Sequence, residues 1–259
     1  MSMHRAALVT GVLACAACAT AEVGDGTGED GATVADASGI DETPDGGEIQ
    51  TQPDAAVLPP DASPPPDAGP ITLSHSATLD IVGANSVACR NANGVLANNY
   101  YRVFSLPVEG VSGSLRVTQV TTGIERSTSG GSGIAASVAI HTLNGALQLE
   151  NLTELARVNT VIPDVAAPPD GQLGGLLHPV PIDVTVPAGS VMVVELGHGS
   201  LGGGRFLFVG SNRAGEEDAT YLRGPDCNIG EPTRSADIPV NNGPLVMHWV
   251  LEVTGQPGD

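Results

Sequence analysis

The chain has 259 residues, of which 10 are basic and 29 acidic, so its formal net charge is −19. This balance argues against nucleic acid as a partner, because phosphate backbones are bound by basic surfaces. All the basic residues are arginines, and the absence of lysine excludes a P-loop, a Schiff-base lysine and a pyridoxal phosphate site.

The first predicted element is an export signal at the start of the chain. A basic start at His4 and Arg5 leads into a short apolar run, and Val12-Leu13-Ala14 then precede Cys15. The run is shorter than the ~20 apolar residues that span a bilayer, so residues 1–14 are expected to be removed as a signal peptide. The pattern resembles the lipobox of bacterial lipoproteins. That resemblance implies cleavage before Cys15 and a diacylglycerol anchor on the Cys15 thiol, which makes the membrane a partner.

Two alternatives to lipidation at Cys15 stay open. Ala17-Cys18-Ala19 has the small-x-small form of an ordinary cleavage site, which predicts a secreted protein that begins at Thr20. Cys18 also competes for the lipid, although Cys15 then occupies the position where an aliphatic residue is expected. Ala16 stands where enteric bacteria use Asp to retain lipoproteins in the inner membrane. The expected location is therefore the outer membrane, facing the periplasm or the cell surface.

Residues 15–70 are predicted to form a disordered acidic tether. From residue 19 to residue 70 the sequence holds twelve acidic side chains and neither a basic nor an aromatic one. The unit Pro-Asp-Ala recurs at 53–55, 60–62 and 66–68. Such a segment has too little apolar surface to offset its ordering entropy, and proline and like charges extend it. The tether is expected to lift the following domain off the envelope surface.

Residues 71–257 are predicted to form one all-β domain. Short strand-like runs alternate with Gly and Pro turns, a pattern typical of an antiparallel β-sandwich of the jelly-roll kind. A helical period at 145–158 also suggests one short helix. The expected strands are 77–82, 100–106, 114–124, 136–143, 180–186, 191–196, 205–209 and 246–253.

Alternation along these runs assigns most of the few aromatic rings to the core. Trp249 shares a face with Met247 and Leu251, so it is expected to be buried. The strand at 206–209 carries phenylalanines on one face and Leu and Val on the other, which suggests burial on both sides. Tyr100 and Tyr101 lie on opposite faces, so one is expected to point outward. This use of rings for packing lowers the case for carbohydrate binding.

Two cysteines belong to the predicted domain, one near each end. In an exported protein Cys89 and Cys227 are most simply one disulfide, and two buried free thiols are the alternative.

Several short motifs of the domain, taken in order, carry a further resemblance. They are similar to a β-sandwich module of secreted and adhesin-like bacterial proteins. The resemblance implies an accessory or adhesive module without assigned catalytic residues. With the lipobox and the tether, the whole chain is similar to surface lipoproteins of the myxobacterial type. The motifs are Tyr100–Phe104, Gly123–Glu125, Val186–Ser190, Val193–Glu195, Gly210–Asn212, Tyr221–Leu222 leading to Cys227, and Glu231–Pro232.

The sequence offers little support for catalysis or for a cofactor. Ser200 lacks the glycine two residues earlier that a nucleophile elbow needs, because His198 stands there. The histidines are scattered without zinc-ligand spacing. The acidic run Glu216, Glu217 and Asp218 is a candidate calcium loop, with a solvated loop face as the favoured interpretation. No catalytic residue and no cofactor are therefore expected.

The expected function is a non-catalytic envelope lipoprotein whose β-sandwich binds a protein or glycan partner. The alternatives are an exported hydrolase with a site assembled from distant strands, and a purely structural envelope protein. A pocket that holds His and carboxylate side chains within hydrogen-bond reach favours the hydrolase. A closed sandwich without a pocket favours the binding module.

Overall fold

Strands make up most of the chain that the computed structural model describes, which is residues 69–238 and 247–258. The predicted signal peptide, Cys15, Cys18 and the tether up to residue 68 lie outside these residues. None of the helices described is long and apolar enough to cross a membrane.

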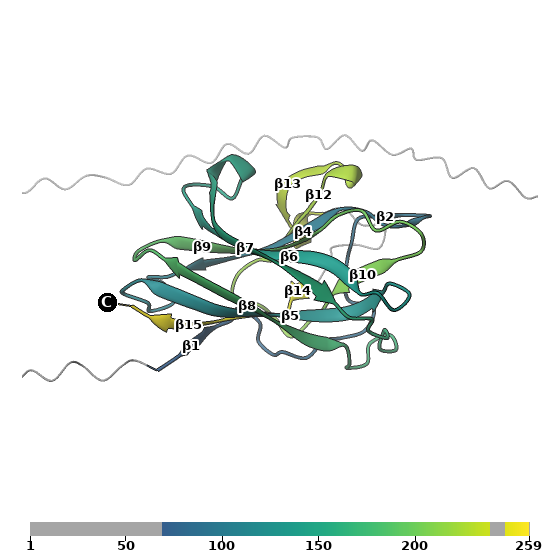
Figure 1. Ribbon diagram of the computed structural model, residues 1–259, viewed down its shortest axis with the longest axis horizontal. Helices are drawn as coiled ribbons and strands as arrows, with labels where there is room; N and C mark the ends of the chain where they lie inside the picture. The colour runs from purple at the N-terminus through teal and green to yellow at the C-terminus, as the bar shows by residue number, and fades with distance from the viewer. Residues whose placement is uncertain (1–68, 239–246, 259) are drawn as a thin grey trace, which may run out of the picture. The chain divides into compact units, whose positions relative to one another are not determined.

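Two antiparallel sheets face each other across the core (Figure 1). The six-stranded sheet has the order β13 (Ile229–Arg234), β12 (Tyr221–Gly224), β4 (Asn98–Ser105), β9 (Val191–His198), β6 (Ile134–Leu143) and β7 (Leu152–Ile162). The five-stranded sheet is built on β5 (Leu115–Thr128), with β8 (Leu176–Val186) along one edge. Along its other edge lie β15 (Leu251–Pro257) and β10 (Phe206–Val209), and β1 (Ile71–Leu73) pairs with β15.

Two small ladders and three short 3₁₀ turns complete the fold. The ladders are β2 (Arg90–Asn91) with β3 (Gly94–Val95), and β11 (Ser211–Asn212) with β14 (His248–Trp249). The turns are η1 (Leu149–Asn151), η2 (Pro225–Cys227) and η3 (Ser235–Asp237).

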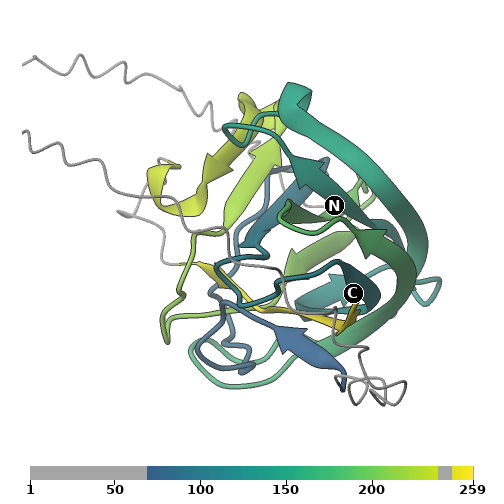
Figure 2. The same ribbon diagram turned by 90° about the vertical axis from the view of Figure 1, so that its left-hand side faces the viewer.

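The order of pairing confirms the predicted jelly-roll-like sandwich. Strand β6 pairs with β7, β5 with β8, and β4 with β9, so the pairs nest within one another along the chain. Successive pairs fall alternately in the two sheets, as happens when a long antiparallel ribbon is wrapped around a core. Figure 2 shows the two layers from the side.

The core lies between the sheets and uses the alternation seen in the sequence. Trp249 is buried as predicted, and its indole N–H donates to Thr122 Oγ1 at 3.0 Å. Tyr100 also points inward, with its ring 6.1 Å from that of Trp249. These contacts satisfy the polar end of a large apolar ring, which is the usual condition for burying a tryptophan.

Two of the secondary-structure predictions, the strand at 77–82 and the helix at 145–158, are wrong. Residues 77–82 form no strand, because the side-chain amide of Asn212 donates to the carbonyls of Thr78 and Asp80 in place of a neighbouring strand. Residues 152–162 form β7 and not a helix, so the spacing of leucines at 147–155 is coincidental. The β-branched residues at 158–162 favour the extended conformation that pairing with β6 requires.

The prediction that β10 is buried on both sides is also wrong. Leu207 and Val209 are fully buried, but Phe206 and Phe208 are only half-buried on the outer face. Their rings lie 6.4 Å apart, and the guanidinium carbon of Arg126 lies 5.1 Å from the Phe206 centroid. The strand is therefore buried on one side only.

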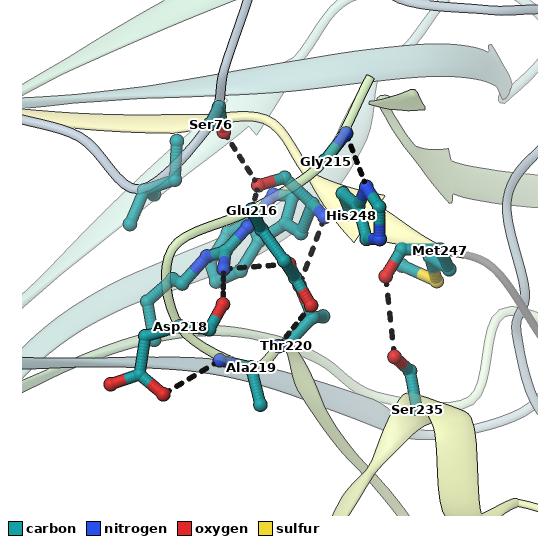
Figure 3. A network of polar contacts seen from close by, with 12 residues as sticks. Ser76, Gly215, Glu216, Asp218, Ala219, Thr220, Ser235, Met247 and His248 are labelled. Carbon is teal, nitrogen blue, oxygen red and sulfur yellow. Dashed lines mark hydrogen bonds and ion pairs between the residues drawn. The ribbon is translucent and has the colours of Figure 1, made fainter. Parts of the chain in front are cut away.

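A buried arginine on β4 ties the 215–220 segment to the sandwich. Arg102 is 0% exposed, lies 2.7 Å from Glu216 Oε2, and donates to the carbonyls of Asp218 and Trp249. The Glu216 carboxylate also accepts from the amide and hydroxyl of Thr220 (Figure 3). Burial lowers the pKa of Arg102, and the neighbouring Glu216 acts in the opposite direction. Every partner of the guanidinium comes from a segment distant in sequence, so this network fixes tertiary structure.

A disulfide joins Cys89 to Cys227, as the sequence predicts. The bridge closes a separation of 138 residues and links the segment just before β2 to η2. Reduction is expected to lower the free energy of unfolding by about 2–5 kcal/mol, because the cross-link restricts the unfolded chain. Urea titration with and without reductant measures this change. Identical midpoints, with reduction verified by thiol labelling, would contradict it.

Candidate functional site

The outer face of the six-stranded sheet carries an unusual row of polar side chains. Tyr100, Arg102 and Phe104 point toward the other sheet, so alternation turns Asn99 and Tyr101 outward. Strand register then places Tyr101 opposite Glu195, Glu195 opposite Ala139, and Ala139 opposite Arg157. Four neighbouring strands, β4, β9, β6 and β7, thus bring together residues that are spread along the chain from Asn99 to Glu195.

Five side chains of the six-stranded sheet form what we call the Glu195 cluster: Asn99, Tyr101, His141, Arg157 and Glu195. The Glu195 carboxylate accepts from Asn99 Nδ2 at 2.6 Å through Oε1. Its Oε2 lies 2.8 Å from His141 Nε2 and 3.1 Å from Arg157 Nη2. Both Glu195 and His141 have side chains less than a tenth exposed. The carboxylate is therefore held by donors on both oxygens.

The charge of Glu195 is maintained by these contacts. Burial alone raises the pKa of Glu195, but donation from His141 and the charge of Arg157 outweigh it, so the pKa is lowered. The same carboxylate, together with burial, raises the pKa of Tyr101. Glu195 is consequently a fixed anion at neutral pH, and a carboxylate so occupied is a poor proton acceptor for a substrate.

The turn between β6 and β7 and the β12–β13 hairpin flank the cluster. Both project from the side of the six-stranded sheet that faces away from β5 and β8 (Figure 1). The amide of Leu149 in η1 donates to Glu231 Oε2 of β13 at 2.9 Å, so the two projections touch. Tyr101 points outward, as expected for one of the two tyrosines, and yet it is only 1% exposed.

Beside the cluster lies a hollow of about 520 Å³, which we call the β6–β7 hollow. It is a shallow depression that is mostly open to solvent, and not an enclosed cavity. Most of its lining residues are small or polar, and none is charged. They are Ala135, Ala136, Ser137, Asn159, Thr160, Val161, Gly197 and Gly199.

Two residues connect the hollow to the Glu195 cluster. Ser137 Oγ accepts from Arg157 Nη1 at 3.0 Å. A Cβ on Gly197 would lie 2.6 Å from Asn99 Nδ2 and 3.3 Å from Glu195 Oε1, so the absence of a side chain lets these groups meet. The cluster thus fixes one wall of the hollow by charge-assisted hydrogen bonds, which favours a preorganised binding surface.

The structure meets part of the condition set for a hydrolase. His141 and Glu195 are within hydrogen-bond reach, and His141 Nδ1 is buried without a partner among the described residues. However, neither side chain lines the hollow. Ser137, the hydroxyl that does line it, is paired with Arg157 and lies opposite Gly197, four residues along β6 from His141. The site therefore lacks a nucleophile in contact with its histidine.

Ser200 and His198 do not form a relay either. Ser200 Oγ lies 3.5 Å from Asp226 Oδ2, whereas His198 Nδ1 bonds to the Gly199 carbonyl. His198 Nε2 is buried without a partner among the described residues, and burial lowers its pKa.

The acidic residues at 216–218 are divided among different roles. Glu216 pairs with Arg102, and the Asp218 side chain accepts from the amide of Ala219. Glu217 is exposed. In residues 69–238 and 247–258, no three His, Cys, Asp or Glu side chains are grouped so that they could hold a metal ion. A calcium ion at Glu216 would have to compete with a buried guanidinium.

The remaining histidines that the structure describes make contacts within the fold. His75 is buried against Glu109 at 2.6 Å and against the Phe104 ring. His178 Nε2 lies 3.0 Å from Thr160 Oγ1, and His248 Nδ1 accepts from the amide of Gly215 (Figure 3).

Sequence reasoning missed the Glu195 cluster. The available signal was a single charged residue within a mostly apolar strand, as at Glu195 in Val191–His198. A buried charge in such a position needs partners, but only strand register reveals which residues supply them.

Comparison with known proteins adds no relative. No family model matches the chain, and neither the curated proteins nor the solved structures contain a significant match.

Proposed function

We propose that this protein is a non-catalytic, envelope-anchored lipoprotein whose β-sandwich binds an external partner through the β6–β7 hollow. The sandwich is not pocketless, as a binding module was expected to be, and the observation that supports the proposal is the hollow beside the Glu195 cluster, whose lining includes neither His141 nor Glu195. A purely structural sandwich has no need of buried charges on its outer face, because they are costly to desolvate. The proposed anchor is Cys15, with the outer membrane as the proposed location.

Binding by the full chain tests this proposal. Gly199→Leu adds a bulky side chain at a lining residue of the hollow, and the change is tolerated because a Cβ at Gly199 meets nothing within 4 Å and Gly199 is not among the glycines with positive φ. Gly230→Leu is the matched control, because Gly230 is equally open and lies on β13 of the same sheet. Capture of envelope or extracellular material by the wild type and by Gly230→Leu, with loss in Gly199→Leu, supports the proposal. No capture by the wild type, or equal capture by all three, contradicts it.

One observation favours the second candidate, an exported hydrolase. The buried His141–Glu195 pair has an open ring nitrogen at His141 Nδ1. If this pair serves catalysis, hydrolysis of ester, amide or glycosidic test substrates will be detected and will be lost in His141→Gln. The binding module predicts no turnover with any of these substrates.

Anchoring gives a separate prediction. Mass spectrometry of the mature protein is expected to show a lipid-modified N-terminal Cys15, and Cys18→Ser is expected to leave that modification in place. Several acyl chains on one residue hold a protein firmly, because each buried methylene contributes about 0.8 kcal/mol. An unmodified mature N-terminus at Thr20 would refute the anchor.

A further inference from the structure

We infer that the ligand of the β6–β7 hollow is a neutral, hydroxyl-rich glycan. This inference rests on the proposed binding function and adds the chemical class of the ligand. Three features of the hollow carry it: two lining strands, β6 and β9, that are paired on both sides, a lining without charge, and polar groups interleaved with small apolar surfaces.

Among the described strands, the hollow leaves no edge for a peptide strand over β6 and β9, and the one unpaired edge nearby, that of β7, points away from β6. Strand β6 is paired with β7 on one side and β9 on the other, and β9 is paired with β4 and β6. Extended peptides gain their affinity by adding to an unpaired strand edge. A ligand on this face must therefore be recognised by side chains.

The lining carries no formal charge, although charged residues stand next to it. Arg157 and Glu195 neutralise each other at 3.1 Å, and Arg157 also pairs with Glu154 at 2.8 Å. With these charges paired, the hollow offers an anion no free cation of its own. The chain's formal net charge of −19 further disfavours acidic ligands.

The lining groups match the two kinds of surface that a sugar presents. Asn159 is exposed, and its amide makes no hydrogen bond to the residues that the structure describes. The Ser137 hydroxyl accepts from Arg157, which leaves its own proton free to donate. No aromatic ring lines the hollow, so stacking does not contribute, and Ala135, Val161 and the two glycines offer small C–H surfaces to the apolar face of a sugar ring instead.

Arrays of neutral and acidic oligosaccharides, probed with the full chain, test this inference. Binding to neutral members is expected to fall about 2- to 10-fold in Asn159→Ala, the loss of one hydrogen bond. Asn144→Ala is the matched control, because Asn144 is exposed in the β6–β7 turn, at the opposite end of the hairpin from the lining residues 135–137 and 159–161, and the variant is expected to bind as the wild type. Gly199→Leu is expected to abolish binding, whereas Gly230→Leu retains it.

Chemical treatment of natural material separates this inference from the proposed function. Periodate cleaves vicinal diols, so it is expected to abolish hollow-dependent capture of an envelope polysaccharide fraction, whereas protease is not. Capture that resists periodate, is lost after protease and still depends on Gly199 overturns the glycan inference but retains the binding function. Preference for acidic oligosaccharides also overturns the inference. No hollow-dependent capture from any fraction overturns both.

Discussion

Replacing Arg102 with methionine is expected to lower the free energy of unfolding by about 3–5 kcal/mol, the range for breaking a buried ion pair. The change leaves Glu216 without its cation, at a site where the Glu216 side chain is only 15% exposed. It also removes the donor to the carbonyls of Asp218 and Trp249. The free energy of unfolding falls mainly because the Glu216 carboxylate stays desolvated without a partner, and not only because the attraction between the two charges is lost. Urea titration followed by tryptophan fluorescence measures the change, since Trp249 is the only tryptophan.

Two further variants separate charge from packing. Arg116→Met removes an arginine that is paired with Asp183 but lies on the surface, and it is expected to leave the midpoint nearly unchanged. Combining Arg102→Met with Glu216→Gln removes both buried charges and is expected to recover part of the loss. A double variant no more stable than Arg102→Met would show that lost packing, and not an unpaired carboxylate, is responsible.

Replacing Glu195 with alanine is expected to lower the free energy of unfolding by about 3 kcal/mol or more. It leaves the buried donors of Asn99 and His141 without an acceptor and the Arg157 charge with Glu154 alone. Glu154→Ala is the matched control, because Glu154 pairs with the same arginine but its side chain is 45% exposed. Equal destabilisation by the two variants would contradict the role given to the buried carboxylate.

The lowered pKa of Glu195 predicts how its contribution to the free energy of unfolding changes with pH. Its pKa in the folded protein is lowered below the ordinary value of 4.5, so in that interval the unfolded chain binds more protons than the folded one. The stabilisation by Glu195 is therefore complete above pH 4.5 and is lost as the pH falls toward the folded value. The difference in unfolding free energy between the wild type and Glu195→Gln is expected to shrink over this range. A difference that grows with acidity would contradict the assignment.

Sequence patterns predicted the fold much better than the site. Period-two alternation placed Trp249, Leu251 and Val253 in the core, because one buried face imposes its pattern on each strand. The disulfide followed from the pairing of two cysteines in an exported chain. Strands β12 and β13 were missed, because they are short and carry Gly and Pro, which are depleted in strands.

The hollow and the Glu195 cluster could not be predicted from the sequence for a different reason. They depend on register: Ser137 faces Gly197, and Ala139 separates Arg157 from Glu195, only because three strands align at particular residues. A shift of one residue in any of these strands would turn the side chains of that strand to the opposite face of the sheet. Nothing local in the sequence fixes that alignment. The half-buried phenylalanines of β10 were likewise misjudged, since alternation gives the side of a strand but not what covers it.

Amide chemical-shift mapping of the full chain, titrated with a neutral oligosaccharide taken from the array, is the most direct test of the account. The β6–β7 hollow predicts that the perturbed amides cluster at Ser137, Asn159, Gly197 and Gly199, and that Gly199→Leu abolishes the shifts. Shifts confined to Phe206 and Phe208 on the opposite sheet, or shifts that persist in Gly199→Leu, would contradict it.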